Sequence, residues 1–426
     1  MRILVVSGLY PPQTAGAAEL FTSWIAEAMR ARGHEMTVLT SWHGLSGPET
    51  GVDAWRLLRF RPSQRFDSSA SVISQLRSAY LYYQCHNCHR NGAVIDRAIR
   101  KTDPQIIYLA EPSGLGLNSV IRATNASRLP VVIHLHNYWL LYLRDPSSEQ
   151  SRFGNTLLKK ILVGPVPEVN YTSMIAVSRL VKDEHVRAGF HDDRIEVIHN
   201  GLPPSTLPQA AERPRPRRRG FLLAARLVEE KGIHVAIQAL AILVKELGYG
   251  DARLDIVGDG QPAYLEQLRE LSLRLGIGEN VDMRGKLDRE TLLEQSADYT
   301  AVLLPSLWKE PFATTVLESM YMGVPIIASR LGGHVEIIED GGNGLLFNPG
   351  DAAQLAQKMH MLLANPELQE TVAGNALVFA RSQLRFESFV ERIELHMERA
   401  LITASTPNEN GEALARPLTR SAGKGL

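Results

Sequence analysis

The sequence predicts an α/β protein built from two doubly wound domains. Short apolar segments alternate with helical patterns, and this alternation starts afresh after a stretch rich in proline and arginine at residues 203–219. Alternation of this kind is typical of parallel sheets covered by helices on both faces. The chain has 426 residues, 44% of them hydrophobic, so it is long enough to bury more than one large core.

The first half contains the strands of the first domain, which we place at residues 1–200. The predicted strands are residues 3–6, 36–39, 106–109, 131–135, 174–177 and 195–198. Between the first two, residues 20–30 carry Leu20, Trp24 and Ala28 on one helical stripe, and Gly33 ends that helix.

The second half repeats the pattern and predicts a second domain at residues 201–381. Its strands are residues 221–224, 254–257, 281–283, 299–304 and 325–328. The segment 203–219 is expected to be an exposed linker. An amphipathic helix is predicted at residues 382–403, and the loss of periodicity after it predicts a disordered tail at residues 404–426.

Charge and hydropathy exclude several classes of protein. Lysine plus arginine equals aspartate plus glutamate at 46 each, so nucleic acid is not an expected partner. No apolar run approaches the roughly 18 residues that span a bilayer. Residues 3–6 fit a buried strand better than a secretory signal, so we expect a cytoplasmic protein. Peripheral membrane contact through Lys159-Lys160 or the basic run 213–219 stays open, because such runs are also ordinary solvated loops.

Both cysteines lie in the segment Cys85-His86-Asn87-Cys88-His89. Its spacing matches covalent haem attachment, which would also require export and a distal ligand. A zinc site usually has four ligands, more than this segment readily supplies. We interpret the two cysteines as an incidental reduced pair, with metal, redox and haem roles as alternatives.

The most informative segment places two carboxylates, Glu310 and Glu318, eight residues apart. Residues 301–304 predict a strand, 305–311 a loop and 312–322 a helix, so Glu318 should lie about two turns into that helix. A helix N-terminus stabilises an anionic group, and nearby carboxylates accept hydrogen bonds from sugar hydroxyls. The segment suits a sugar nucleotide, and a capped surface helix with two solvated glutamates fits it equally well.

Two loops after predicted strands carry residues suited to phosphate. Gly16 and its small neighbours open the helix at residues 20–30, so backbone N–H groups there could approach a phosphate. After the strand 221–224, Arg226 and Lys231 could clamp a diphosphate, although a solvated loop uses the same residue types. Neither a complete GxGxxG nor a GxxxxGK[ST] motif is present, so a nicotinamide site and a Walker phosphate loop are not supported.

These residues together resemble the retaining glycosyltransferases of family GT4, which have the GT-B fold of two facing Rossmann-like domains. The resemblance covers nearly the whole chain. It is carried by Tyr10-Pro-Pro with Gly16-Ala-Ala-Glu19, His136-Asn-Tyr-Trp139, His199-Asn-Gly201, Ala225-Arg-Leu-Val-Glu-Glu-Lys-Gly232, Gly258-Asp-Gly260, Pro305-Ser-Leu-Trp-Lys-Glu-Pro-Phe312 with Glu318, Gly323-Val-Pro325 and Gly332-Gly-His-Val-Glu336. Ala15 and Ala225 depart from the family's common glycines.

The resemblance implies a role for each candidate catalytic residue. Arg226 and Lys231 would hold the donor diphosphate and neutralise the leaving group. Glu318 would accept from the ribose hydroxyls, and Glu310 would lie beside the transferred sugar. His136 would face that sugar from the first domain; from its residue type alone it could equally be a satisfied buried histidine.

The resemblance also implies where the donor lies. Its site would be the cleft between the two domains, with Gly16 against the phosphates and Phe312, Ala313 and Thr314 also in contact with the donor. The C-terminal helix at residues 382–403 would cross back onto the first domain.

The implied reaction is retaining transfer from a nucleoside-diphosphate sugar to a glycan, a lipid-linked acceptor or a small molecule. Glycosyl transfer passes through an oxocarbenium-like transition state, and cations aimed at the leaving group stabilise it. The chain contains no Asp-x-Asp pair, so Arg226 and Lys231 are expected to replace a metal ion, with no cofactor besides the nucleotide sugar. A sugar-nucleotide epimerase or phosphorylase and a binding regulator without catalysis are the alternatives.

Overall fold

The computed structural model describes residues 1–12, 16–41, 53–56, 80, 83–84, 86–144, 167–208 and 220–406. These residues divide into two compact units. Unit 1 comprises the described parts of Met1–Val177 and Val181–Ile198, with the C-terminal helix from Val390 onward. Unit 2 comprises Ser178–Leu180 and the described part of His199–Phe389. The boundary that we expected after residue 200 falls between Ile198 and His199.

The described strands of unit 1 form one seven-stranded sheet in the order β3-β2-β1-β4-β5-β6-β7, and every neighbouring pair is parallel. This is the strand order of a dinucleotide-binding fold with one added strand. The strands are β1 (Arg2–Ser7), β2 (Glu35–Thr40), β3 (Asp53–Arg56), β4 (Ile106–Glu111), β5 (Val131–Leu135), β6 (Ser173–Ala176) and β7 (Ile195–Val197).

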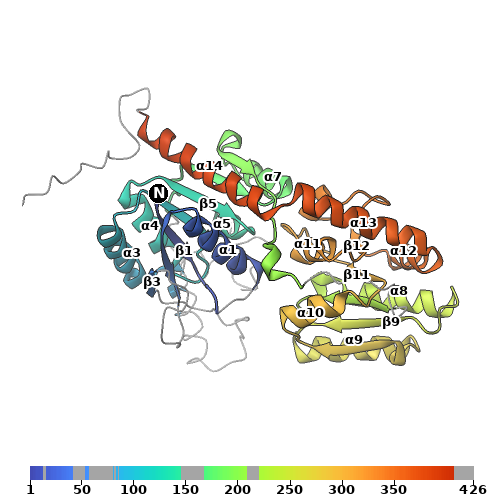
Figure 1. The fold of residues 1–426 in the computed structure, drawn as a ribbon. Helices are drawn as coiled ribbons and strands as arrows, with labels where there is room; N and C mark the ends of the chain where they lie inside the picture. Colours follow the sequence, from blue (N-terminus) through green and yellow to red (C-terminus); the bar gives the residue numbers. More distant parts are fainter. Residues whose placement is uncertain are drawn as a thin grey trace, which may run out of the picture. The chain divides into compact units, whose positions relative to one another are not determined.

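The helices of unit 1 follow its strands, as Figure 1 shows for α1, α3 and α4. Phe21, Ile25 and Met29 recur every four residues and are buried, which makes α1 an amphipathic helix. The helices are α1 (Ala17–Ala31), α3 (His89–Thr102), α4 (Leu117–Ser127), α5 (Trp139–Arg144), from Val181 α7 (Arg179–Arg187), a 3₁₀ turn (Asp192–Arg194) and, from Val390, α14 (Phe386–Ser405).

Unit 2 contains a six-stranded parallel sheet in the order β10-β9-β8-β11-β12-β13. This order again matches a dinucleotide-binding fold. The strands are β8 (Gly220–Ala224), β9 (Arg253–Val257), β10 (Val281–Gly285), β11 (Ala301–Leu304), β12 (Ile326–Ser329) and β13 (Leu345–Phe347).

Helices cover both faces of the second sheet. Alternate strand residues such as Phe221, Leu223 and Leu303 pack with α8 and α12, while α11 packs on β11, β12 and α13. The helices are α8 (Ile233–Lys245), α9 (Pro262–Arg274), α10 (Arg289–Ser296), α11 (Thr314–Tyr321), α12 (Ala352–Ala364) and α13 (Pro366–Gln383), with 3₁₀ turns at Pro204–Thr206, Glu229–Lys231, Gly278–Asn280 and Gly333–Ile337.

The predicted fold class is confirmed, and all predicted strands are present with ends shifted by at most two residues. β3 and β13 were not predicted. The helix expected at residues 382–403 instead runs from Phe386 to Ser405, because Gln383 ends α13. The tail expected from residue 404 was therefore placed too early, since Ala404 and Ser405 are helical.

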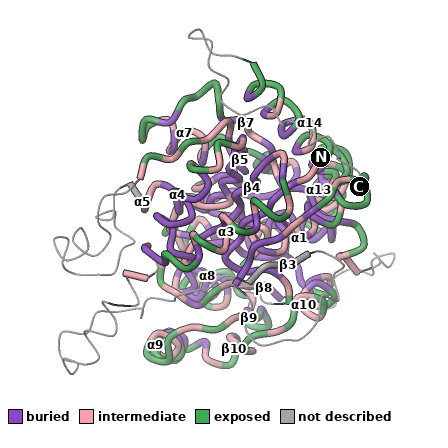
Figure 2. Tube along the Cα trace, turned by 90° about the vertical axis from the view of Figure 1, so that its left-hand side faces the viewer, coloured by how far each residue is buried: buried purple, intermediate pink, exposed green. Residues whose placement is uncertain are grey.

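Several sequence predictions fall outside the described residues: Ala15, Cys85, Lys159-Lys160, the basic run 213–219 and the tail from residue 407. Within the described part, burial follows the layers of the fold, and Figure 2 shows buried strands such as β4 and β5 beneath partly exposed helices. No described helix combines the length and the apolar character that a membrane span requires.

Candidate functional site

The strand order of unit 2 reverses between β8 and β11, and two loops with charged residues meet there. In open α/β sheets, ligands bind at the carboxyl ends of strands where the order reverses. The loop after β8 ends in the turn Glu229–Lys231, and the loop after β11 contains Glu310. Backbone hydrogen bonds join the two loops, since Leu307 N–H donates to the Glu230 carbonyl at 2.8 Å.

Lys231 and Glu310 form an ion pair at this position. Lys231 Nζ lies 2.5 Å from Glu310 Oε1, and the two side chains are only 15% and 9% exposed. Ser306 Oγ donates to the same carboxylate oxygen at 2.8 Å. The sequence predicted both charged residues for the site, but it did not predict their direct contact or the hydrogen bond from Ser306.

Glycines allow the loops to approach this pair closely. Gly232 has a φ of +68°, and a Cβ atom there would lie 1.8 Å from the Pro305 carbonyl oxygen. Gly332 has a φ of +116°, and its Cβ would lie 2.9 Å from Glu310 N. A side chain at either position would push the loops apart, so the local chain path requires glycine.

The other members of the predicted donor set lie around the pair. Arg226 is exposed, with its guanidinium 3.5 Å from Glu230. Phe312 is buried and stacks on the His199 ring with 5.6 Å between the ring centroids. Ala313 is the N-cap residue of α11. α11 begins at Thr314, two residues later than predicted, which leaves the N–H groups of its first turn beside this loop.

Glu318 lies about one turn into α11, rather than the predicted two. It bonds Arg289 of α10, with Nε to Oε1 at 2.7 Å, and Arg289 Nη1 donates to the Thr206 carbonyl at 2.7 Å. Burial raises the pKa of the Glu318 carboxyl, and the neighbouring Arg289 opposes that shift. Arg289 was missed because Asp288-Arg289 resembles an ordinary helix start.

His334 is a further residue that the sequence analysis did not select. It is fully buried, and its Nε2 lies 3.0 Å from the Ser329 carbonyl oxygen. Burial lowers the pKa of His334; the hydrogen bond to the Ser329 carbonyl and the charge of Glu310 oppose that shift, whereas Lys231 adds to it. The ring is therefore neutral near pH 7, with Nε2–H as the donor.

In unit 1, Gly16 and His136 follow β1 and β5. The Gly16 N–H already donates to Glu19 Oε2 at 3.0 Å, so a phosphate at this point would have to displace a carboxylate. The His136 ring stacks on the Phe21 ring with 6.1 Å between the ring centroids, and its centroid lies 3.9 Å from that of the His134 ring. Burial lowers the pKa of His136 to about 3, so the imidazole is neutral at pH 7.

Glu111 is an acidic residue at the carboxyl edge of the first sheet that the sequence analysis did not find. It ends β4, next to β1, where the strand order of unit 1 reverses. It accepts hydrogen bonds from Ser113 N at 3.3 Å and from the Asn137 side chain. Burial raises its pKa. The apolar strand before it was the only available signal.

The structure thus brings Lys231 and Glu310 into contact and pairs Glu318 with Arg289. Gly16 and His136 belong to the other unit. Among the side chains that the structure describes, no three histidine, cysteine, aspartate or glutamate residues gather as metal ligands.

Two family models match this chain in succession. Residues 18–206 match the model described as Glycosyltransferase Family 4, and residues 209–377 match Glycosyl transferases group 1. An uncharacterized glycosyltransferase of Methanocaldococcus jannaschii is 25% identical over 88% of this chain and 92% of its own. A glycogen synthase of Mycobacterium tuberculosis is 28% identical over 86% of this chain and 87% of its own.

Solved structures agree on the fold. HepE from Anabaena, crystallised with UDP and glucose, has a TM-score of 0.66 and 23% identity, and the match covers 93% of this chain and 99% of that one. Sucrose-phosphate synthase from Thermosynechococcus elongatus has a TM-score of 0.69 and 19% identity over 95% of this chain and 100% of that one. The chain belongs to the family 4 glycosyltransferases, which have the GT-B fold.

Proposed function

We propose that this glycosyltransferase moves a sugar from a nucleoside-diphosphate sugar to a glycan or lipid-linked acceptor, with retention of anomeric configuration and without a metal ion. The observation that carries the proposal is the Lys231–Glu310 pair where the strand order of unit 2 reverses. Related solved structures that hold UDP and UDP-glucose support the donor class.

The ion pair is suited to a diphosphate because it orients the ammonium group without using up its donors. A lysine ammonium has three N–H groups, and the contact with Glu310 occupies one of them. The remaining two can donate to diphosphate oxygens. The fixed positive charge then stabilises the leaving group more as its negative charge develops, which lowers the barrier to transfer.

The donor's remaining parts have matching groups nearby. Glu318, held by Arg289, can accept from ribose hydroxyls, and the second oxygen of Glu310, which bonds no residue that the structure describes, can accept from a sugar hydroxyl. Arg226, exposed on the same loop as Lys231, adds a second cation for the diphosphate. In unit 1, the neutral His136 can exchange hydrogen bonds with a sugar hydroxyl without adding charge.

A donor screen followed by a transfer assay tests this function. The full-length protein is incubated with UDP-, GDP- and ADP-sugars, and thermal shift identifies those that bind. Transfer of labelled sugar from the selected donor, with the product's anomeric configuration read by NMR, is the expected result. Binding without transfer or hydrolysis would favour a regulator, and interconversion of the donor sugar would favour an epimerase.

A further inference from the structure

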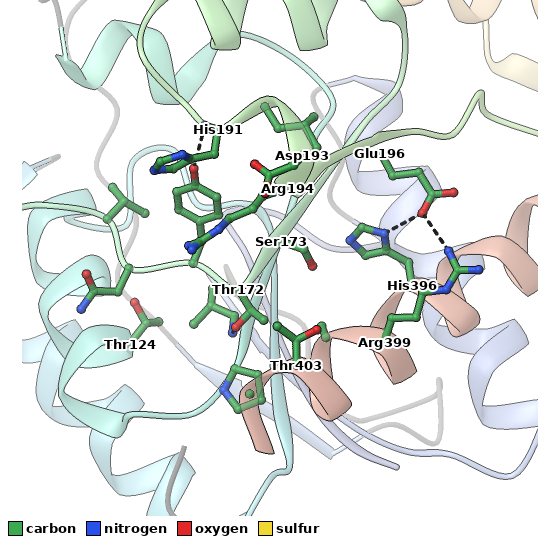
Figure 3. Close-up of a pocket in the computed structure, with 18 of the residues that line it drawn as sticks. Thr124, Thr172, Ser173, His191, Asp193, Arg194, Glu196, His396, Arg399 and Thr403 are labelled. Atoms are coloured by element: carbon green, nitrogen blue, oxygen red, sulfur yellow. Dashed lines mark hydrogen bonds and ion pairs between the residues drawn. The ribbon is translucent and has the colours of Figure 1, made fainter. Parts of the chain in front are cut away.

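A large pocket in unit 1 is lined by none of the candidate donor-site residues described above. It opens at the amino ends of β5, β6 and β7, beside the last turns of α14, and its volume is about 1060 Å³ (Figure 3). Small-molecule sites usually span roughly 300–1,000 Å³. His136 follows the carboxyl end of β5, about 16 Å away along a five-residue strand, so the pocket is separate from it.

The charges that line the pocket are balanced. The described lining holds four permanent cations and four carboxylates, namely Arg128, Lys182, Arg194, Arg399, Glu168, Asp192, Asp193 and Glu196. Some are paired, such as Lys182 with Asp192 at 2.9 Å and Arg399 with Glu196 at 3.8 Å. Because neither sign is in excess, the pocket offers no net attraction to a polyanion or a polycation. It offers many hydrogen-bond donors and acceptors instead.

Two buried polar atoms in the pocket have no hydrogen-bond partner among the described residues. They are His396 Nε2 and Ser173 Oγ. His396 is 6% exposed, and its Nδ1 lies 2.9 Å from Glu196 Oε2, so Nδ1 carries the proton and Nε2 is an acceptor. In Figure 3 the His396 ring lies between Glu196 and Ser173. Leaving such atoms unsatisfied is unfavourable, and a side-chain rotation that brings either atom to the pocket surface would let a ligand hydroxyl form a hydrogen bond with it.

Ser173 can also turn its hydroxyl toward the open part of the pocket. The residue as a whole is only half-buried, and a serine side chain has three staggered rotamers. The pocket adds an aromatic surface, because the Tyr171 ring lines it and carries Arg194 at 5.9 Å from its centroid. Balanced charge, many polar partners and one aromatic ring suit a neutral ligand rich in hydroxyl groups.

We propose that this pocket binds a neutral oligosaccharide, as a second glycan site separate from the transfer site. This proposal rests on the proposed function in one respect, because the acceptor or product of a glycosyltransferase is a hydroxyl-rich glycan. A glycan held at two points binds more tightly than at one, since the second contact is intramolecular.

Direct binding of sugars by the full-length protein tests the proposal. Short neutral oligosaccharides of glucose, mannose, galactose and N-acetylglucosamine are titrated without nucleotide, followed by saturation-transfer NMR and calorimetry. Inorganic phosphate and a sulfated oligosaccharide are titrated in parallel. Thr403→Trp fills the pocket from α14. Its control is Ile402→Trp, which adds the same side chain at the preceding position; Ile402 is 67% exposed and does not line the pocket. In a second matched pair, Ser173→Ala removes a hydroxyl from the pocket lining, and its control Ser405→Ala removes a hydroxyl from a residue that does not line the pocket.

We expect saturable binding of at least one neutral oligosaccharide, weakened about tenfold or more by Thr403→Trp and by less than about twofold by Ile402→Trp. Ser173→Ala should weaken it severalfold, which keeps the test decisive if the tryptophan variant fails to fold. Absence of sugar binding to the unmodified protein, equal binding by both tryptophan variants, or phosphate as the ligand that Thr403→Trp blocks would overturn the proposal. Sugar binding blocked by Thr403→Trp in a protein that transfers from no donor would support the pocket and reject the proposed function.

Discussion

Lys231 and Glu310 each follow an apolar strand, which is why the sequence located both residues. Their contact spans 79 positions and depends on β8 lying beside β11. Local periodicity does not encode which strands are neighbours, so the ion pair could not be predicted. The same holds for Arg289, whose partner Glu318 lies on another helix. Residue types that suit a ligand were therefore readable from the sequence, and their pairing was not.

Replacing Lys231 with alanine should reduce turnover while the protein stays folded. If Lys231 faces the leaving group as proposed, its removal should cost roughly 2–4 kcal/mol of transition-state stabilisation, or on the order of 30- to 1,000-fold in rate. Lys245→Ala is the matched control, because Lys245 is exposed at the other end of α8. Steady-state kinetics and melting curves measure both variants. A Lys231→Ala enzyme within about threefold of Lys245→Ala would contradict the diphosphate assignment.

Replacing Glu318 with glutamine should weaken binding of the donor nucleotide by roughly 1–3 kcal/mol, because ribose hydroxyls lose a charged acceptor. The glutamine retains the shape of the side chain and an oxygen for Arg289. Calorimetry with the nucleoside diphosphate measures the effect, and Glu290→Gln on exposed α10 surface is the control. Unchanged nucleotide affinity in Glu318→Gln would show that Glu318 serves only the ion pair.

At the scale of whole elements, apolar runs located the central strands because those strands are buried on both faces. β3 was missed because Asp53–Arg56 has a charged residue at each end and no apolar run, and β13 because its apolar run, Leu345–Phe347, has only three residues. The start of α14 was misplaced because α13 and α14 are separated by only two residues and both are amphipathic. Element type was thus predictable where burial repeats, and element ends depended on tertiary packing.

Replacing Gly232 with alanine should destabilise unit 2 far more than replacing Gly248. Both glycines have a positive φ, +68° and +81°, so each substitution should cost roughly 1–2 kcal/mol of backbone strain. Only at Gly232 would the added Cβ collide with backbone, 1.8 Å from the Pro305 carbonyl oxygen, whereas nothing lies within 4 Å of a Cβ at Gly248. Denaturant melts should show the larger loss for Gly232→Ala. Equal losses would mean that the two loops do not meet as described.

For the molecule as a whole, transfer should persist in excess EDTA. In the proposed mechanism Lys231 and Arg226 stabilise the leaving group, and chelation does not remove their charges. The same assay with added Mg²⁺ or Mn²⁺ should give rates within about twofold, as expected when no step uses metal coordination. Loss of transfer on chelation, with recovery on adding either metal, would show that metal independence is wrong.

The stability of the whole chain should fall as the pH drops below about 6.5, because several histidines are buried in the neutral form. Burial lowers the pKa of His185 from 6.5 to about 4, with smaller opposing contributions from the Val181 carbonyl and Glu184. A lowered folded-state pKa means that the unfolded chain binds the proton first. Stability is therefore fully present above pH 6.5 and is lost as the pH falls toward 4.

For the fully buried His185, this linkage amounts to about 2 kcal/mol between pH 8 and pH 5. Glutamine at position 185 does not titrate, so His185→Gln should lose less stability over this range than the unmodified protein. The exposed His191, changed to glutamine, is the matched control for the substitution itself. Urea unfolding at pH 8, 6.5 and 5 measures these differences. If His185→Gln and the unmodified protein lost the same stability on acidification, His185 would not be held neutral in the folded chain.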